Sequence, residues 1–260
     1  DMLPIVSSLP ANACATISES LGGTGICPLA TSTESAKADI PSKPDSHFAP
    51  GGVISVPLVS GDISLAATGT ITEIDGNKVY AFGHSFLGYG NVDLPMAGGE
   101  VHTVVANRNF SFKLASPGPI VGAIRSDEQP GIYGEIAAKP RLIPLRINLS
   151  RYNMSEPKTF NCNLVYNELY SAVALQAAII GAVTMQGSLP TEHTVKYDTR
   201  IAIEGFNPIE FKNISSGMSI GEVMSDIIGS VGVLMSNPGG SADISSIDIN
   251  IDISDVDNTA

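Results

Sequence analysis

The chain has 260 residues, of which 43% are hydrophobic and 15% are charged, and its formal net charge is −12. A chain of this length and hydrophobicity can bury one large core or two small ones. The negative charge and the lack of any basic run exclude a nucleic-acid or anionic-membrane partner, because nothing would neutralise phosphate groups. The sequence also lacks a zinc-type cysteine cluster and a phosphate-binding G-x-x-x-x-G-K-[ST] loop, so we expect no cofactor.

Residues 1–50 predict an N-terminal segment followed by a linker. The first 30 residues hold two short apolar patches with Cys14 and Cys27, and residues 31–50 are polar with three prolines. A disulfide between Cys14 and Cys27 would stabilise a segment with little core of its own, and three free thiols, Cys162 included, are the alternative. The start has no basic residues, apolar run or initiator Met, so we expect a processed piece of an exported protein.

Residues 51–152 predict a β-barrel domain. They contain short runs rich in β-branched residues, separated by turn residues. The clearest hairpin is ITEIDGNKVYAF, in which Asp75-Gly76 lies between two alternating strands. Glycines recur at positions 118, 122, 131 and 134, a spacing typical of bulges where strands coil tightly. This density of strands is typical of a barrel or a sandwich.

Residues 153–260 predict an α+β region, which makes the whole chain mainly β with two or three helices. Residues 168–187, ELYSAVALQAAIIGAVTMQG, are apolar nearly all round but short for a membrane span, so we expect a buried helix. Residues 219–238 predict an amphipathic helix that ends before Asn237-Pro238. The alternation in ISSIDINIDIS predicts a last strand with one buried face.

Residues 80–95, YAFGHSFLGYGNVDLP, raise the question of catalysis because His84 stands beside a glycine-rich turn. A catalytic base must reach a hydroxyl with one ring nitrogen while a carboxylate orients the other nitrogen. Asp127 or Asp93 can supply that carboxylate, although either can instead cap a turn. The structural alternative is a histidine that ends a strand by hydrogen-bonding to a backbone carbonyl.

Four segments in fixed order carry a resemblance to a known family. They are VPLVSGDISLAATGTIT, VYAFGHSFLGYGNVDLPM, FKLASPGPIVGAIRSDEQPGIYGEIAAKPRLIPLRI and LMSNPGGSADISSIDINI. Between about residues 4 and 253 the chain resembles bacterial secreted or envelope serine peptidases with the SpoIVB peptidase domain, which are related to sporulation factor IV B. The resemblance implies a trypsin-like double β-barrel, a protein or peptide substrate, and His84 as the general base.

The nucleophile of the resembled family has no counterpart in this sequence. The family carries its serine in a G-M-S-G-S-P motif, where small residues let backbone amides form an oxyanion hole. Here Gly217-Met218-Ser219 continues as IGE, so Ser219 and Glu222 predict a helix-capping box. Ser85 follows His84 directly, and neighbouring residues on a strand point to opposite faces. We therefore expect the serine to come from an upstream segment or a separate chain.

Two functions from different classes remain open. The first is the histidine-bearing part of a secreted SpoIVB-like serine endopeptidase, completed by a serine-bearing segment. The second is a non-catalytic, β-rich binding or assembly subunit of the cell envelope, in contact with other envelope chains. The glycine-histidine, DLP and GIYG segments favour the first, and the acidic composition and missing serine favour the second. Both place the protein in the envelope or outside the cell, without a membrane-spanning helix.

Overall fold

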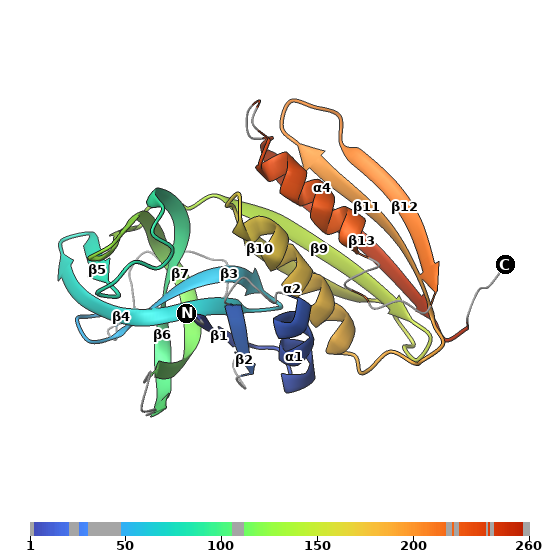
Figure 1. The fold of residues 1–260 in the computed structure, drawn as a ribbon, viewed down its shortest axis with the longest axis horizontal. Coiled ribbons are helices and arrows are strands. Elements are labelled where there is room, and N and C mark those ends of the chain that lie inside the picture. Colours follow the sequence, from blue (N-terminus) through green and yellow to red (C-terminus); the bar gives the residue numbers. More distant parts are fainter. Residues whose placement is uncertain are drawn as a thin grey trace.

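The computed structural model describes residues 3–20, 26–30, 48–105, 112–216, 220, 224–237, 239 and 242–256. Within these residues thirteen strands form one mixed sheet, in the order β12-β11-β13-β9-β10-β3-β6-β7-β8-β5-β4-β1-β2 (Figure 1). The helices are α1 (Ala11–Ser20), α2 (Tyr170–Thr184) and α4 (Ser225–Met235). The strands are β1 (Leu3–Ser7), β2 (Ile26–Ala30), β3 (Val53–Gly61), β4 (Leu65–Asp75), β5 (Lys78–Ala81), β6 (Gly90–Val105), β7 (Phe112–Glu128), β8 (Gly131–Ile136), β9 (Leu142–Arg151), β10 (Lys158–Val165), β11 (Thr194–Ile203), β12 (Ile209–Ser216) and β13 (Ile244–Ser254).

Six strands, β3 to β8, pair in a ring. β3 pairs with both β4 and β6, and the ring continues through β5, β8 and β7, with every pair antiparallel. The contact between β3 and β6 is a single residue pair, Ser55 with Ala97. The mainly β architecture predicted for the chain is confirmed.

The predicted hairpin forms, with its turn one residue further along than expected. Asp75 pairs with Lys78 across the two strands, which leaves Gly76 and Asn77 as the two central turn residues. Gly76 has a φ of +60°, a conformation that glycine adopts without steric cost. The turn therefore rests on a glycine in its first central position.

Glycines make room for a buried side chain inside the ring. Met96 of β6 is fully buried. Its Sδ atom lies 2.6 Å from the position that a Cβ on Gly134 would take, and its Cε atom lies 2.7 Å from the same position at Gly122. A larger residue at either glycine would displace Met96 or the strand backbone. These glycines therefore serve packing inside the ring.

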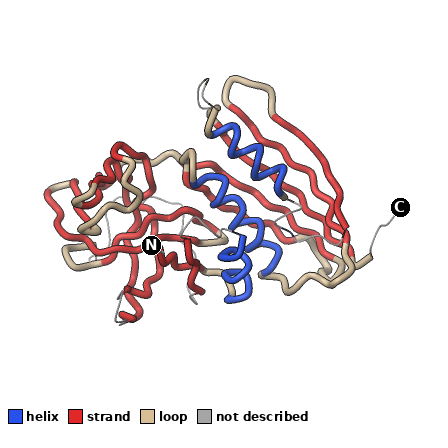
Figure 2. Tube along the Cα trace, in the orientation of Figure 1, coloured by secondary structure: helices blue, strands red, loops and turns tan. Residues whose placement is uncertain are grey.

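The remaining strands form a sheet with helices on one face. Figures 1 and 2 show α2 and α4 lying on the same side of β9, β13 and β11. α2 buries ten of its fifteen residues, because it lies between this sheet and the helices α1 and α4. This environment explains its apolar sequence and confirms the buried helix predicted at residues 168–187.

β13 lies between β9 and β11, and this central position explains its alternating sequence. It runs parallel to β9 and antiparallel to β11. Its isoleucines face the helices and are at most 4% exposed, whereas the residues between them face the open side of the sheet. The last strand with one buried face was predicted correctly.

The N-terminal segment joins the same sheet. β1 pairs antiparallel with β4, and β2 pairs parallel with β1. Cys14 is buried on α1, and Cys162 is a buried free cysteine on β10. The side chain of Cys27, the linker at residues 31–47 and the capping box at Ser219 lie outside the described residues. The pairing of Cys14 with Cys27 stays a prediction.

None of the described helices combines the length and the apolar character needed to cross a membrane.

Candidate functional site

His84 lies in a loop, and not at the end of a strand as expected. β5 ends at Ala81, and Phe82 and Gly83 both have a φ of 74°, which turns the chain away from the sheet. A positive φ is unusual for phenylalanine. The Phe82 N–H donates to the Thr70 carbonyl at 2.9 Å, and the Phe82 ring occupies the place of an absent side chain at Gly69. Packing of Phe82 therefore holds the start of the loop.

The His84 imidazole is exposed and anchored at one nitrogen. Its Nδ1 lies 2.7 Å from the Ser85 carbonyl oxygen, and its ring lies 5.7 Å from the Phe82 ring, centroid to centroid. Because a carbonyl oxygen only accepts, Nδ1 carries the proton of this hydrogen bond. In the neutral ring Nε2 then keeps its lone pair and can accept a proton.

Asp127 fixes the loop that follows His84 and does not contact the imidazole. Its side chain is fully buried and accepts three backbone N–H groups, from Phe86 at 2.7 Å, Leu87 at 2.5 Å and Gly88 at 2.8 Å. Successive N–H groups that converge on one anion form a nest. The structure therefore places this predicted site residue beneath the loop, where it positions the backbone.

Asp93 is also engaged elsewhere. Its carboxylate pairs with the Arg125 guanidinium and accepts the backbone N–H of Arg141 at 3.0 Å. These contacts join β6 and β7 to the segment before β9. The structure brings neither Asp93 nor Asp127 into hydrogen-bond contact with His84, among the interactions that it describes.

The loop conformation removes the reason for excluding Ser85 as the nucleophile. Ser85 was set aside as a nucleophile because neighbouring strand residues face opposite ways, but residues 82–89 are not a strand. The carbonyl of Ser85 holds the His84 ring, and its hydroxyl lies 3.9 Å from the position that a Cβ on Gly88 would take. The Ser85 side chain therefore faces the far end of the loop.

Two tyrosines near the loop were missed by sequence reasoning. Tyr170 begins α2, and its hydroxyl interacts with Tyr89 and with the charge of Asp127. Burial first, and then these two neighbours, raise the pKa of Tyr170. Tyr170 and Tyr89 are separated along the chain by the five strands β6 to β10, so no local pattern connects them. The start of α2 therefore covers one side of the loop.

An open hollow of about 480 Å³ borders the loop at Gly83. Tyr80 and Tyr133 lie in its wall as a cross-strand pair, with ring centroids 5.6 Å apart. Glu128 also lines it, and Glu135 accepts the Tyr133 hydroxyl at 2.7 Å, which raises the pKa of that tyrosine. The wall of the hollow therefore contains two aromatic rings and the carboxylate of Glu128.

Comparisons with protein-family models, with curated proteins and with solved structures give no match. Within the described residues, no three His, Cys, Asp or Glu side chains are grouped closely enough to hold a metal ion. The argument about function therefore depends on the geometry of the loop and on the resemblance of its motifs.

Proposed function

We propose that this chain is the histidine-bearing part of a secreted or envelope serine endopeptidase of the SpoIVB type. His84 would act as general base, and a serine from an upstream segment or another chain would complete the site. The observation that carries the proposal is the exposed position of His84 on a loop between two strands of the ring. Its Nδ1–H is donated to the Ser85 carbonyl, so in the neutral ring Nε2 keeps a free lone pair.

The ring of six antiparallel strands supports the same proposal. A trypsin-like peptidase places its catalytic loops on β-barrels, and His84 lies on a loop between two ring strands, β5 and β6. We propose that this ring is one barrel of such a fold. The hollow beside Gly83, with Tyr80 and Tyr133 in its wall, would receive an extended peptide.

A carbonyl group orients this histidine less strongly than a carboxylate does. In a Ser-His-Asp triad the aspartate holds the imidazole tautomer and stabilises the imidazolium that forms. The Ser85 carbonyl holds the tautomer but carries no full negative charge. Asp127 acts as a positioning residue, because it fixes the backbone of residues 86–88 and so the loop that carries the ring. We therefore expect a lower rate of catalysis than a complete triad gives.

The test uses a fluorophosphonate probe, which labels only activated serines. The tagged chain is added to an envelope and secreted fraction from the organism that produces it, and co-purifying polypeptides are treated with the probe. When the unmodified chain is used, we expect the probe to label one co-purifying polypeptide. When His84→Ala is used, the same polypeptide should still co-purify but should no longer be labelled. Ser85→Ala is the matched control, because it keeps the carbonyl that anchors His84.

Two results would contradict the peptidase proposal. Labelling of a captured polypeptide that is equal for the unmodified chain and His84→Ala would remove His84 from the reaction. Probe labelling of the isolated chain at Ser219 would mean that the chain contains its own nucleophile.

A non-catalytic envelope subunit is the second candidate, and the contacts made by the two aspartates favour it. Asp127 and Asp93, the two carboxylates predicted for the site, already bind backbone amides or an arginine. A capture experiment that recovers envelope proteins without any probe-reactive serine would support this function.

A further inference from the structure

β12 is the last strand at one end of the sheet. It pairs with β11 on its inner side, and no strand of the described part of the chain pairs with its outer side (Figure 1). An unpaired edge presents N–H and C=O groups that can pair with a further strand. Natural proteins block such edges unless another strand pairs with them. The backbone groups of β12 that face outward therefore indicate how a further strand would pair.

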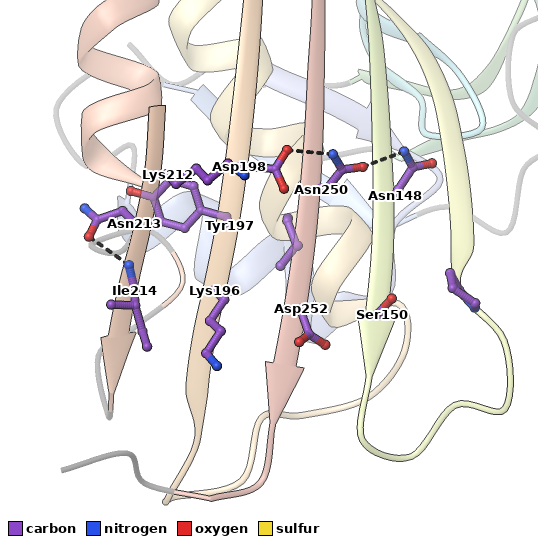
Figure 3. Close-up of a pocket in the computed structure, with 12 residues that line it drawn as sticks. Asn148, Ser150, Lys196, Tyr197, Asp198, Lys212, Asn213, Ile214, Asn250 and Asp252 are labelled. Carbon is purple, nitrogen blue, oxygen red and sulfur yellow. Dashed lines mark hydrogen bonds between the residues drawn. The ribbon is translucent and has the colours of Figure 1, made fainter. Parts of the chain in front are cut away.

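The hydrogen bonds identify which residues of β12 face outward. The Ile214 N–H donates to the Asn213 side-chain oxygen at 2.8 Å, so it does not bond to β11 (Figure 3). Antiparallel pairing alternates residues that bond to one neighbour with residues that bond to the other. Glu210, Lys212 and Ile214 therefore direct their backbone groups outward, and Phe211 and Asn213 direct theirs toward β11.

The side chains on the open face of this sheet form cross-strand rows of charged and polar residues. The row that ends at Glu210 consists of Arg146, Asp248, Arg200 and Glu210. The row that ends at Lys212 consists of Asn148, Asn250, Asp198 and Lys212. Figure 3 shows the hydrogen bonds within the second row, from Asn148 to Asn250 and from Asn250 to Asp198, each 2.8 Å long. The two rows end at the sheet edge with opposite charges.

We propose that β12 pairs with β12 of a second copy of this chain, antiparallel, about a two-fold axis at Phe211. This register places Glu210 of each copy opposite Lys212 of the other. The row of Arg146, Asp248, Arg200 and Glu210 then continues into Lys212 and Asp198 of the second copy, with the charges still alternating. The edge is complementary to itself, and this complementarity selects a second copy as the occupant.

Among the other registers that keep the outward groups opposed, those with the axis at Lys212 or at Asn213 each meet an obstacle. An axis at Lys212 places the two lysines directly opposite each other, and like charges in that position are destabilising. An axis at Asn213 requires the Ile214 N–H, which the Asn213 side chain already occupies. The axis at Phe211 uses only free backbone groups of Glu210 and Lys212, and it leaves Ile214 outside the pairing.

On the opposite face of the pair, Phe211 lies at the centre and is flanked by Ile209 and Asn213 in the proposed register. Phe211 lies directly opposite its own counterpart, in a position where Cα atoms are about 4.5 Å apart. Ile209, which is 37% exposed in the single chain, lies on the same side as Phe211. The pairing therefore covers apolar surface at the edge as well as satisfying backbone groups.

Charge reversal tests the proposal through the dissociation constant of the dimer, measured by sedimentation velocity over a range of protein concentrations. Glu210→Lys and Lys212→Glu each create two like-charge pairs in the proposed register, so each should weaken association about tenfold. The double variant restores opposite charges and should recover most of the association. Lys196→Glu, a reversal on β11 away from the edge, is the matched control and should change association little.

Cysteine cross-linking tests the register independently. Phe211→Cys should form an intermolecular disulfide under mild oxidation, because the two Cα atoms fall within disulfide range. Asn213→Cys should not, because Asn213 lies opposite Ile209 of the second copy. Cross-linking of Asn213→Cys without Phe211→Cys would overturn the register. A chain that remains monomeric at every concentration, or a dimer unaffected by both single reversals, would overturn the proposal itself.

Discussion

The carboxylate of Asp127 lies 2.8 Å from the amide nitrogen of Gly88, and it binds the amides of Phe86 and Leu87 as well. One buried side chain thereby fixes three successive backbone groups of the loop that carries His84. Residues 82–89 are not part of a strand, so these bonds replace part of the pairing that a strand would supply. The geometry around the imidazole therefore depends on a residue that does not touch it.

Replacing Asp127 with Asn should destabilise the fold by about 2–3 kcal/mol. The asparagine amide keeps one acceptor oxygen but turns an NH₂ group toward backbone donors, and the charge is lost. Urea unfolding measures the effect, and amide exchange at residues 86–88 should accelerate. Asp93→Asn is the control, because it removes a partly exposed ion pair that contributes about 1 kcal/mol or less. Equal losses in the two variants would contradict the role assigned to Asp127.

Replacing Gly69 with Ala should disturb the start of the same loop. The new Cβ would lie 2.0 Å from two atoms of the Phe82 ring, so Phe82 or the backbone must move. We expect a loss of about 1–3 kcal/mol in the free energy of unfolding. The His84 ring packs against Phe82, so the chemical shifts of its ring protons should change as well.

Gly229→Ala is the matched control for that substitution. Gly229 lies in α4, and a Cβ there would meet no atom within 4 Å. Alanine has the higher helix propensity, so this variant should gain about 0.5–1 kcal/mol. Destabilisation by both variants would mean that glycine is required for reasons other than the contact with Phe82.

Local patterns predicted the elements whose burial is regular along the chain. The isoleucines of β13 alternate because one face of the strand is buried, and α2 is apolar because it is covered on most sides. β12 was missed, because an edge strand with two exposed rows has no such pattern. These elements show that the sequence predicts burial better than it predicts edges.

The contacts of the site were harder to predict than the strands around it. The structure brings Asp127 to the loop that carries His84, because its carboxylate binds the amides of residues 86–88. Their relationship is different from the expected one, because hydrogen bonds between a loop and a distant strand leave no periodic signal. Tyr170 and Tyr89 are also brought together only by tertiary structure, which leaves no local pattern in the sequence.

Arg151 should contribute strongly to stability although it has no acidic partner among the described residues. Its side chain is buried, and its guanidinium donates to the carbonyl oxygens of Gly187 at 2.8 Å, Val183 at 3.4 Å and Ser188. These groups lie at the C-terminal end of α2, where a positive charge is favourable. Arg151→Ala should lower the free energy of unfolding by about 3–4 kcal/mol.

Two further variants show whether the buried guanidinium causes the loss of stability expected for Arg151→Ala. Arg151→Lys keeps the charge but not the planar fork, so it should recover only part of the loss. Arg146→Ala, on the same strand, removes an exposed pair with Asp248 and should lose less than about 1 kcal/mol. Full recovery with lysine would assign the effect to charge alone.

Cys162 should be unreactive in the folded protein and should make stability depend on pH in the alkaline range. Burial raises the pKa of its thiol from 9.0 to about 11. The unfolded chain loses this proton near pH 9, whereas the folded chain retains it, so unfolding becomes more favourable as the pH rises. Relative to Cys162→Ala, the unmodified chain should lose about 2 kcal/mol between pH 9 and pH 11. Iodoacetamide at pH 8, followed by peptide mapping, should label Cys162 rapidly only after unfolding in urea. Rapid labelling of the folded chain, or equal pH dependence in the two proteins, would show that the thiol is accessible to water.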